Sequence, residues 1–286
     1  MSVSFCGIEL EHAFINASGT WDPIAAHKAF GQAAFDEFPF SAHVTKTITV
    51  QPRQGNSAPR IWELPAGMIN SIGLPNKGID RWLAEDLPQL AALPVPLIVN
   101  VMGFSTTELE LLVARVSGET PAVAIELNVS CPNVETGTIV GSDPVECFRV
   151  VDAVRPLTDL PLIVKLTPNA TDPAAVAVAA VEAGADSISL INTLRGVAFD
   201  PVTGNRWLGG GTGGVSGPGV KAIALAQIAS VNEAIDAPIV GIGGVTNGRD
   251  AADMVRAGAD LVAIGTASFR DPRAANAIRS EYSKIL

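Results

Sequence analysis

One stretch decides the predicted fold: Glu126-Leu127-Asn128-Val129-Ser130-Cys131-Pro132-Asn133-Val134. It continues an apolar run that begins at Ala122 and is rich in branched residues, as expected of a parallel strand buried on both faces. Pro132 ends that strand because proline has no backbone donor for a ladder. Two asparagines, a serine and a thiol therefore stand at the carboxyl end of a buried strand, which in a parallel α/β barrel is the floor of the active site.

Similar apolar runs that end in polar or glycine residues recur along the chain. Together with the one above they are Ala42–Thr49, Gly67–Leu74, Pro96–Gly103, Ala122–Ser130, Pro161–Pro168, Ser187–Leu194, Pro238–Val245 and Leu261–Ser268. Their length and β-branched content predict eight strands.

Helix-like stretches separate most of these runs. The expected helices are Asp80–Leu90, Thr106–Ser117 with Thr106 as N-cap, Asp143–Val154, Asp172–Gly184, Lys221–Ala234, Arg249–Ala257 and Pro272–Ser283. Alternating strands and helices in a chain of this length predict an α/β fold, a (β/α)8 TIM barrel that forms a single domain over residues 1–286. An open doubly wound sheet is the alternative, but no GxGxxG follows the first strand.

Three segments depart from the repeat. Val3–Asn16 alternates loosely and predicts an N-terminal β-hairpin that plugs the barrel floor, followed by the small-residue loop Ala17–Thr20. Long loops are expected after strand one, at Gln51–Ala66, and after strand six, at Arg195–Gly219. Long loops in a compact domain usually serve function.

Composition and charge exclude several classes of function. The formal net charge of -10 disfavours nucleic-acid binding. No apolar stretch reaches the roughly 18–20 residues of a membrane span, and the N-terminus does not resemble a signal peptide. Three widely spaced cysteines without a CxxC pattern favour a reduced, cytoplasmic location. His12, His27 and His43 form no ligand-like cluster, so we expect no metal site.

The predicted strand ends share a set of polar residues and glycines that a barrel would bring into one cup. They are Lys46, Thr47, Asn70, Ser71, Gly73, Asn100, Asn128, Cys131, Lys165, Asn192, Thr193, Gly243, Gly244, Gly265 and Thr266. Glycines at strands seven and eight let backbone amides approach a phosphate. Asparagines suit a planar ligand with alternating amide groups, and lysines can hold a carboxylate or negative charge on a reduced ring.

Cys131 is the best candidate for a base or nucleophile, because no histidine lies near strand four. A free thiol has a pKa of about 8.5, which is near the working range for proton abstraction. Glu126 lies within strand four, and its side chain could point to either face of the sheet.

Several stretches, in family order along nearly the whole chain, resemble class 1 dihydroorotate dehydrogenases. They are Asn70–Leu74, Glu126–Val134, Val164–Asn169, Ile191–Thr193, Gly213–Pro218, Pro238–Gly244 and Ile264–Thr266. The resemblance implies an FMN-binding barrel that oxidises dihydroorotate to orotate in de novo pyrimidine biosynthesis. It also implies that Cys131 removes the C5 proton while hydride passes from C6 to FMN. A serine base and an N-terminal extension would mark membrane-linked class 2 members, so Cys131 and the start of this sequence argue against that class.

The resemblance also assigns the binding residues. Those expected to hold the substrate are Lys46, Asn70, Ser71, Ile72, Gly73, Leu74, Asn128, Asn192 and Thr193. Those expected to hold FMN are Ser18, Lys46, Thr47, Asn100, Asn128, Lys165, Ile191, Ser216, Gly217, Gly243, Gly244, Gly265 and Thr266.

The subclass is decided by short loops. Val134–Gly137 and Val140–Pro144 look like class 1B, whose members pass electrons to NAD through a subunit with FAD and a 2Fe–2S cluster. Gly73–Asn76 looks as much like the fumarate-reducing class 1A. We favour class 1B, with a homodimer of barrels as its core and an FAD and iron–sulfur partner, and keep class 1A as the alternative.

Other functions are less favoured. A dihydropyrimidine dehydrogenase-like flavoenzyme acts on uncharged pyrimidines and has less need of Lys46, and a tRNA-dihydrouridine-type reductase should be basic. A non-catalytic flavin-binding scaffold is expected to lose the base, whereas this sequence keeps Cys131.

Overall fold

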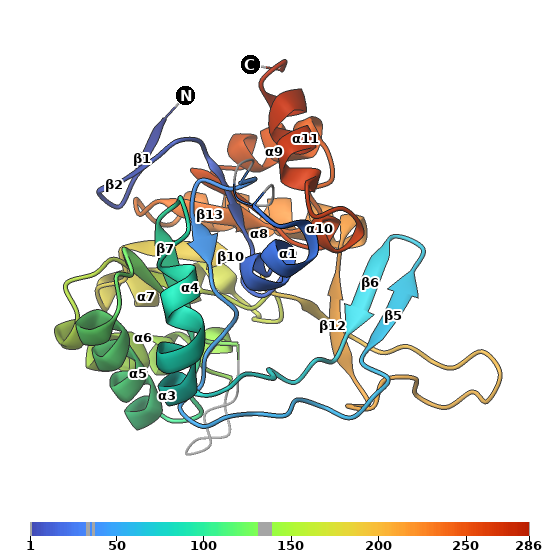
Figure 1. Ribbon diagram of the computed structural model, residues 1–286, viewed down its shortest axis with the longest axis horizontal. Helices are drawn as coiled ribbons and strands as arrows, with labels where there is room; N and C mark the ends of the chain where they lie inside the picture. The colour runs from blue at the N-terminus through green and yellow to red at the C-terminus, as the bar shows by residue number, and fades with distance from the viewer. Residues whose placement is uncertain (1, 33–34, 36–37, 131–138, 286) are drawn as a thin grey trace.

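The computed structural model describes residues 2–32, 35, 38–130 and 139–285, and its centre is an eight-stranded parallel sheet (Figure 1). Neighbouring strands follow the order β3-β14-β13-β10-β9-β8-β7-β4. Their bounds are β3 (Phe14–Asn16), β4 (His43–Val44), β7 (Leu97–Val101), β8 (Ala124–Asn128), β9 (Leu162–Lys165), β10 (Ser187–Leu190), β13 (Ile239–Ile242) and β14 (Leu261–Ile264). The predicted (β/α)8 barrel is confirmed.

The first and last strands of this order, β3 and β4, are joined largely through one side chain. Asn16 Nδ2 donates to the Val44 carbonyl at 2.7 Å, and the Val44 amide donates to Asn16 Oδ1 at 2.8 Å. One backbone hydrogen bond, from the Ser41 amide to the Phe14 carbonyl at 2.9 Å, adds to the contact. The carboxamide of Asn16 is fully buried and offers a donor and an acceptor, so it takes the place of a peptide group and closes the barrel.

The identity of two predicted strands is corrected. Gly67–Leu74 is not a barrel strand, because β6 (Gly67–Asn70) pairs antiparallel with strands outside the barrel. The first barrel strand is instead β3, which lies within the stretch that predicts the N-terminal hairpin. The hairpin itself is shorter than predicted and consists of β1 (Val3–Phe5) and β2 (Ile8–Leu10). The run at Ala42–Thr49 therefore supplies the second barrel strand rather than the first.

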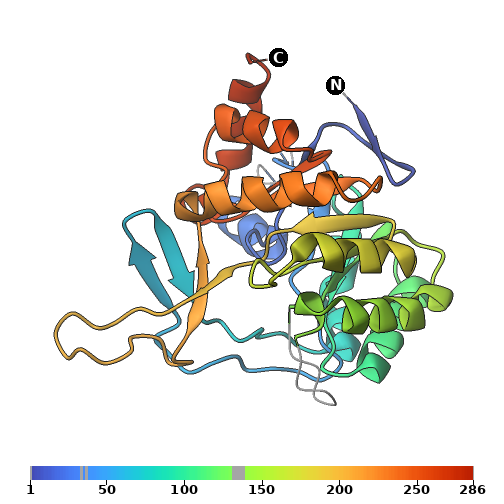
Figure 2. The same ribbon diagram turned by 180° about the vertical axis from the view of Figure 1, so that it is seen from behind.

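The two long loops form a second sheet rather than irregular chain. Its order is β11 (Leu194–Gly196), β12 (Gly213–Ser216), β6 and β5 (Ile61–Leu64), all antiparallel. Ile69 of β6 is fully buried there against Ala198 and Leu208. Figure 2 shows this sheet standing beside the barrel, with the connection between β11 and β12 extending away from it. The sheet places β6 next to the carboxyl ends of the barrel strands.

Helices cover the barrel from outside, and most begin and end close to the predicted residues. They are α1 (Pro23–Phe30), α3 (Ile79–Arg81), α4 (Leu87–Leu90), α5 (Thr106–Glu119), α6 (Pro144–Val154), α7 (Pro173–Glu182), α8 (Lys221–Asn232), α9 (Gly248–Arg256), α10 (Ala267–Arg270) and α11 (Ala274–Tyr282). A π-helical turn (Trp82–Asp86) joins α3 to α4, and 3-10 turns occupy Val140–Ser142, Arg155–Leu157 and Pro218–Val220.

The helix caps explain where two of the predicted helices begin. Asp143 and Asp172 accept hydrogen bonds from the first amides of α6 and α7, and each is followed by proline, as the sequence indicates. The cap of α5 is corrected, because Ser105 rather than Thr106 accepts from the Glu108 amide at 3.2 Å.

Apolar packing forms two main layers. One lies between the helices and the strands. The other fills the barrel interior and includes Phe5 and Leu10 of the hairpin together with Ile98, Ile163 and Val240. The hairpin therefore packs against the barrel interior, as predicted, and leaves the carboxyl ends of the strands free for a site. Within the described ranges, no helix has both the length and the apolarity that crossing a membrane requires.

Candidate active site

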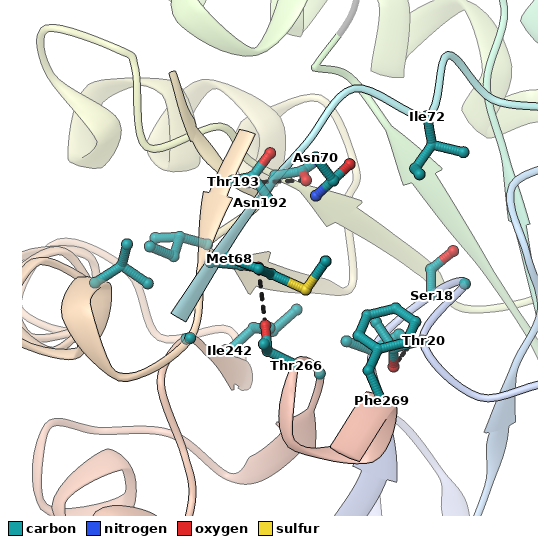
Figure 3. A pocket seen from close by; sticks show the side chains of 18 of the residues that line it. Ser18, Thr20, Met68, Asn70, Ile72, Asn192, Thr193, Ile242, Thr266 and Phe269 are labelled. Atoms are coloured by element: carbon teal, nitrogen blue, oxygen red, sulfur yellow. Dashed lines mark hydrogen bonds between the residues drawn. The ribbon is translucent and has the colours of Figure 1, made fainter. Parts of the chain in front are cut away.

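A cavity of about 410 Å³ lies at the carboxyl ends of the barrel strands, and Figure 3 shows part of its lining. Its lining residues come from the loop after β3, from the segments that follow β4 and β10, from β8 and β9, from the glycine turns after β13 and β14, and from β6 and β12 of the second sheet. In Figure 3, Asn70, Asn192 and Thr193 gather at one side, Ser18, Thr20 and Phe269 at another, and Met68 lies between them.

Most predicted site residues line this cavity. They are Ser18, Lys46, Thr47, Asn70, Ile72, Gly73, Leu74, Asn128, Lys165, Ile191, Asn192, Thr193, Ser216, Gly217, Gly243, Gly244, Gly265 and Thr266. Residues far apart in sequence are thus brought to one place, as the barrel predicts.

Two predicted residues do not line the cavity. Ser71 is buried behind its wall, where Asn56 Nδ2 donates to Ser71 Oγ at 2.9 Å. Asn100 is fully buried on β7 and lies beside Glu126 rather than on the cavity surface. The predicted base, Cys131, lies outside the described residues.

Two lysines bring positive charge to the cavity. Lys46 lies across Gly19, so closely that a Cβ at Gly19 would be 2.7 Å from Lys46 Cδ and 2.9 Å from Nζ. Lys46 is exposed where it lines the cavity, while its side chain packs against Gly19. Loss of solvent around the amine, and next the charge of Lys165, lower the pKa of Lys46. An anion in the cavity would offset both effects, because it favours the charged form of an amine.

The asparagines are held by one another and by the backbone. Asn192 Nδ2 donates to Ser130 Oγ at 2.9 Å and to Asn128 Oδ1 at 3.3 Å, while Asn192 Oδ1 accepts from the Thr193 amide at 2.9 Å. Asn70 Nδ2 donates to the Gly214 carbonyl at 3.3 Å, which fixes Asn70 from the second sheet. These contacts leave amide groups at the cavity surface in set orientations, as recognition of a planar polar ligand requires.

The opposite part of the cavity is built from glycines and small hydroxyl side chains. Thr266 Oγ1 and Ser216 Oγ lie 2.8 Å apart, and Ser18 Oγ donates to the Thr45 carbonyl at 2.7 Å. Gly244 has a φ of +77°, and a Cβ there would lie 2.7 Å from Lys221 Cβ, so a side chain is excluded. The chain can therefore bring backbone amides close to a ligand at this side, which suits a phosphate group.

A buried polar layer around Glu126 lies beneath the cavity floor. The sequence left open to which face of the sheet the Glu126 side chain points. Glu126 points into the barrel, where it is only 4% exposed. Its carboxylate accepts from Asn100 Nδ2 at 2.5 Å and from Ser189 Oγ at 2.8 Å, and lies 3.7 Å from Lys165 Nζ. Alternation along the strand could not have placed Glu126, because a strand buried on both faces shows no polar alternation.

Some lining residues were not predicted from the sequence. They include Thr20, Ile61, Met68, Val220, Thr246 and Phe269. Ile61 and Met68 come from the second sheet. The sequence predicts Ile61 in a long loop and Met68 in a barrel strand. Phe269 is 57% exposed and follows the predicted glycine turn by only a few residues. An aromatic residue just beyond that turn was the sequence signal that could have identified Phe269 as a lining residue.

The chain is similar in sequence to known proteins. The family model described as dihydroorotate dehydrogenase matches residues 1–286. A protein of Geobacter sp. (strain M21) is 43% identical over 287 residues, with 100% of this chain and 93% of the relative covered. A protein of Pelobacter propionicus is 44% identical over 291 residues, with the same coverages. Both relatives are named dihydroorotate dehydrogenase B (NAD(+)), catalytic subunit.

A solved structure is similar in fold. It is the crystal structure of DHODH from Eimeria tenella in complex with ferulenol. The TM-score is 0.79 at 23% sequence identity, and the match covers 99% of this chain and 84% of the other. At this identity the likeness supports the barrel alone.

Proposed function

The chain belongs to the dihydroorotate dehydrogenase family, and we propose that it is the catalytic subunit of an enzyme that oxidises dihydroorotate to orotate in pyrimidine biosynthesis. One observation carries the proposal: a single cavity at the strand ends is lined by a lysine and asparagines and also by a glycine turn. The first set suits a cyclic amide with a carboxylate, and the second suits a phosphorylated cofactor. We propose that residues 1–286 act as one such domain.

The family is flavin-dependent, and we propose FMN as the flavin. A cavity of about 410 Å³ is within the usual range for small-molecule and cofactor sites. The turn at Gly244 brings the backbone to the cavity without a side chain, as close approach of a phosphate requires. Ser216, Gly244 and Thr266 would face the phosphate, and Lys165 would face the ring.

We propose that the substrate binds between Lys46 and the asparagines. Lys46 would pair with the carboxylate, and Asn70, Asn128 and Asn192 would hold the amide groups of the ring. Cys131, whose role rests on the resemblance, would take the proton from C5. The flavin, when bound, supplies the acceptor for the hydride from C6. The roles of these side chains are to orient the substrate and to hold or remove a proton.

We further propose that electrons leave through a partner subunit. The relatives are named catalytic subunits of an enzyme that uses NAD(+), which favours class 1B over the fumarate-reducing class 1A. On this proposal, the partner carries FAD and a 2Fe–2S cluster and binds a homodimer of barrels. A cytoplasmic location is also proposed, from the widely spaced cysteines.

Assays of the purified chain test these points together. Bound flavin is released by denaturation and identified by chromatography, and dihydroorotate oxidation is measured with a dye, fumarate and NAD(+) side by side. We expect FMN, activity with the dye, poor activity with fumarate, and NAD(+) reduction only after co-expression with the partner. A protein that takes up no flavin would contradict the function, and rapid fumarate reduction would place the chain in class 1A.

A further inference from the structure

Glu126 is the carboxylate that lies beneath the cavity floor, and it links four neighbouring strands. It stands on β8, while the groups around its carboxylate come from Asn100 on β7, Lys165 on β9 and Ser189 on β10. A side chain on β8 reaches β10 across β9 because the interior of a small barrel brings these strands together. Glu126 therefore connects the polar side chains of one layer in the barrel interior, just below the site.

The three groups contact the carboxylate differently. Asn100 Nδ2 and Ser189 Oγ make hydrogen bonds to separate oxygens, at 2.5 Å and 2.8 Å. Lys165 Nζ lies 3.7 Å from Oε1, which is within ion-pair range but beyond a normal hydrogen bond. The ammonium group is attracted to Glu126 while its donors stay available, and Lys165 also lines the cavity above. A lysine used only for structure would be expected to bind its carboxylate more closely.

The same carboxylate fixes which end of the Asn100 amide faces it. An ionised carboxylate only accepts hydrogen bonds, so it selects the amide nitrogen of Asn100. The other end, Oδ1, is then turned away and remains buried without a partner among the described residues.

We propose that Glu126 is a positioning residue for the flavin, which holds the Lys165 cation where it meets the ring and limits the positive charge beneath it. This inference rests on the proposed function, since it requires a flavin in the cavity. The site has two lysines, Lys46 and Lys165, and Glu126 offsets one of these charges. Removing the carboxylate leaves more positive charge beneath the ring, which favours the electron-rich reduced flavin.

The test replaces Glu126 with glutamine, which keeps the shape of the side chain and removes its charge. Two properties of the purified protein are measured: the affinity of the apoprotein for FMN, by titration, and the midpoint potential of the bound flavin. In Glu126→Gln we expect FMN affinity to fall about tenfold or more, as for loss of a hydrogen bond to a charged group. We also expect the midpoint potential to become more positive than in the unmodified chain.

Two further variants separate charge from packing. Ser189→Ala removes one contact of Glu126 but keeps its charge, and should leave the midpoint potential unchanged. Glu126→Asp keeps the charge but withdraws the carboxylate by one methylene, so FMN affinity should fall while the potential stays near that of the unmodified chain. Glu126→Asp also carries the test if Glu126→Gln does not fold, as judged by circular dichroism; unchanged FMN affinity would then contradict the proposal.

The outcomes distinguish this inference from the proposed function. An unmodified chain that binds no FMN refutes the proposed function itself. An unmodified chain that binds FMN, together with a folded Glu126→Gln variant of equal affinity and equal potential, refutes only the role of Glu126. A potential that shifts equally in Ser189→Ala would assign the effect to packing and would also overturn the proposal.

Discussion

Gly19→Ala should weaken orotate binding without removing any charged group. Gly19 has a φ of +72°, and the added methyl would lie 2.7 Å from Lys46 Cδ and 2.9 Å from Nζ. Real Cβ atoms do not approach other atoms so closely, so the flexible Lys46 side chain must move. The substitution therefore displaces the cation that we propose to pair with the substrate carboxylate.

The magnitude follows from two separate costs. An alanine at positive φ is strained by about 1–2 kcal/mol, which lowers the stability of the fold. A hydrogen bond to a charged group contributes about 1.5–3 kcal/mol, and partial displacement of Lys46 should cost about 1–2 kcal/mol of that. At about 1.4 kcal/mol per factor of ten, orotate affinity should fall roughly 5- to 30-fold.

Gly204→Ala provides a matched control. Gly204 has a φ of +71°, nearly that of Gly19, but a Cβ there would meet nothing within 4 Å. Both variants therefore carry the same backbone strain, and only one of them touches Lys46. Orotate is titrated into flavin-replete protein and followed by the change in the flavin spectrum, with flavin content measured in parallel. Equal orotate affinity in Gly19→Ala, Gly204→Ala and the unmodified chain would refute the role given to Lys46.

Three further predictions concern the base, the pH dependence and the closure of the barrel. Cys131→Ala should lower the rate of flavin reduction by dihydroorotate by about 10²–10⁴ while FMN stays bound, and an unchanged rate in stopped flow would remove Cys131 from the mechanism. The pKa of Lys46 is lowered from the usual 10.5, and the charged form of Lys46 binds the carboxylate, so orotate affinity should be full at neutral pH and should fall as the pH rises through the lowered pKa. Calorimetric titrations of orotate across pH measure this. Constant orotate affinity up to pH 10.5 would contradict the prediction. Asn16→Ala leaves the amide and carbonyl of Val44 unpaired, at about 2–6 kcal/mol together. At about 2 °C per kcal/mol for a chain of this size, the melting temperature should drop by roughly 4–12 °C, against little change for the exposed Asn205→Ala. A drop no larger than that of Asn205→Ala would mean that Asn16 does not close the barrel.

Much of the site was predictable because its residues follow a rule of the fold. The carboxyl ends of parallel barrel strands meet at one face, so polar residues at those ends must lie close together. This places Lys46, Asn128, Lys165 and Asn192 in one cavity before any contact is known. The same rule did not show that Asn100, within β7, lies beside Glu126 beneath the cavity floor, and it could not fix the direction of Glu126.

The sequence by itself determined the class of fold and most helix ends. Those features depend on local properties, namely the period of apolar residues and the caps at Asp143 and Asp172. Tertiary structure alone decided which runs form the barrel. An apolar, β-branched run such as Gly67–Leu74 can pair in a parallel barrel or in an antiparallel sheet. Which of the two it joins depends on the strands that pair with it in the folded chain. Likewise, Phe14–Asn16 forms the first strand because the Asn16 carboxamide makes hydrogen bonds with Val44, 28 residues away. No local sequence pattern indicates that contact.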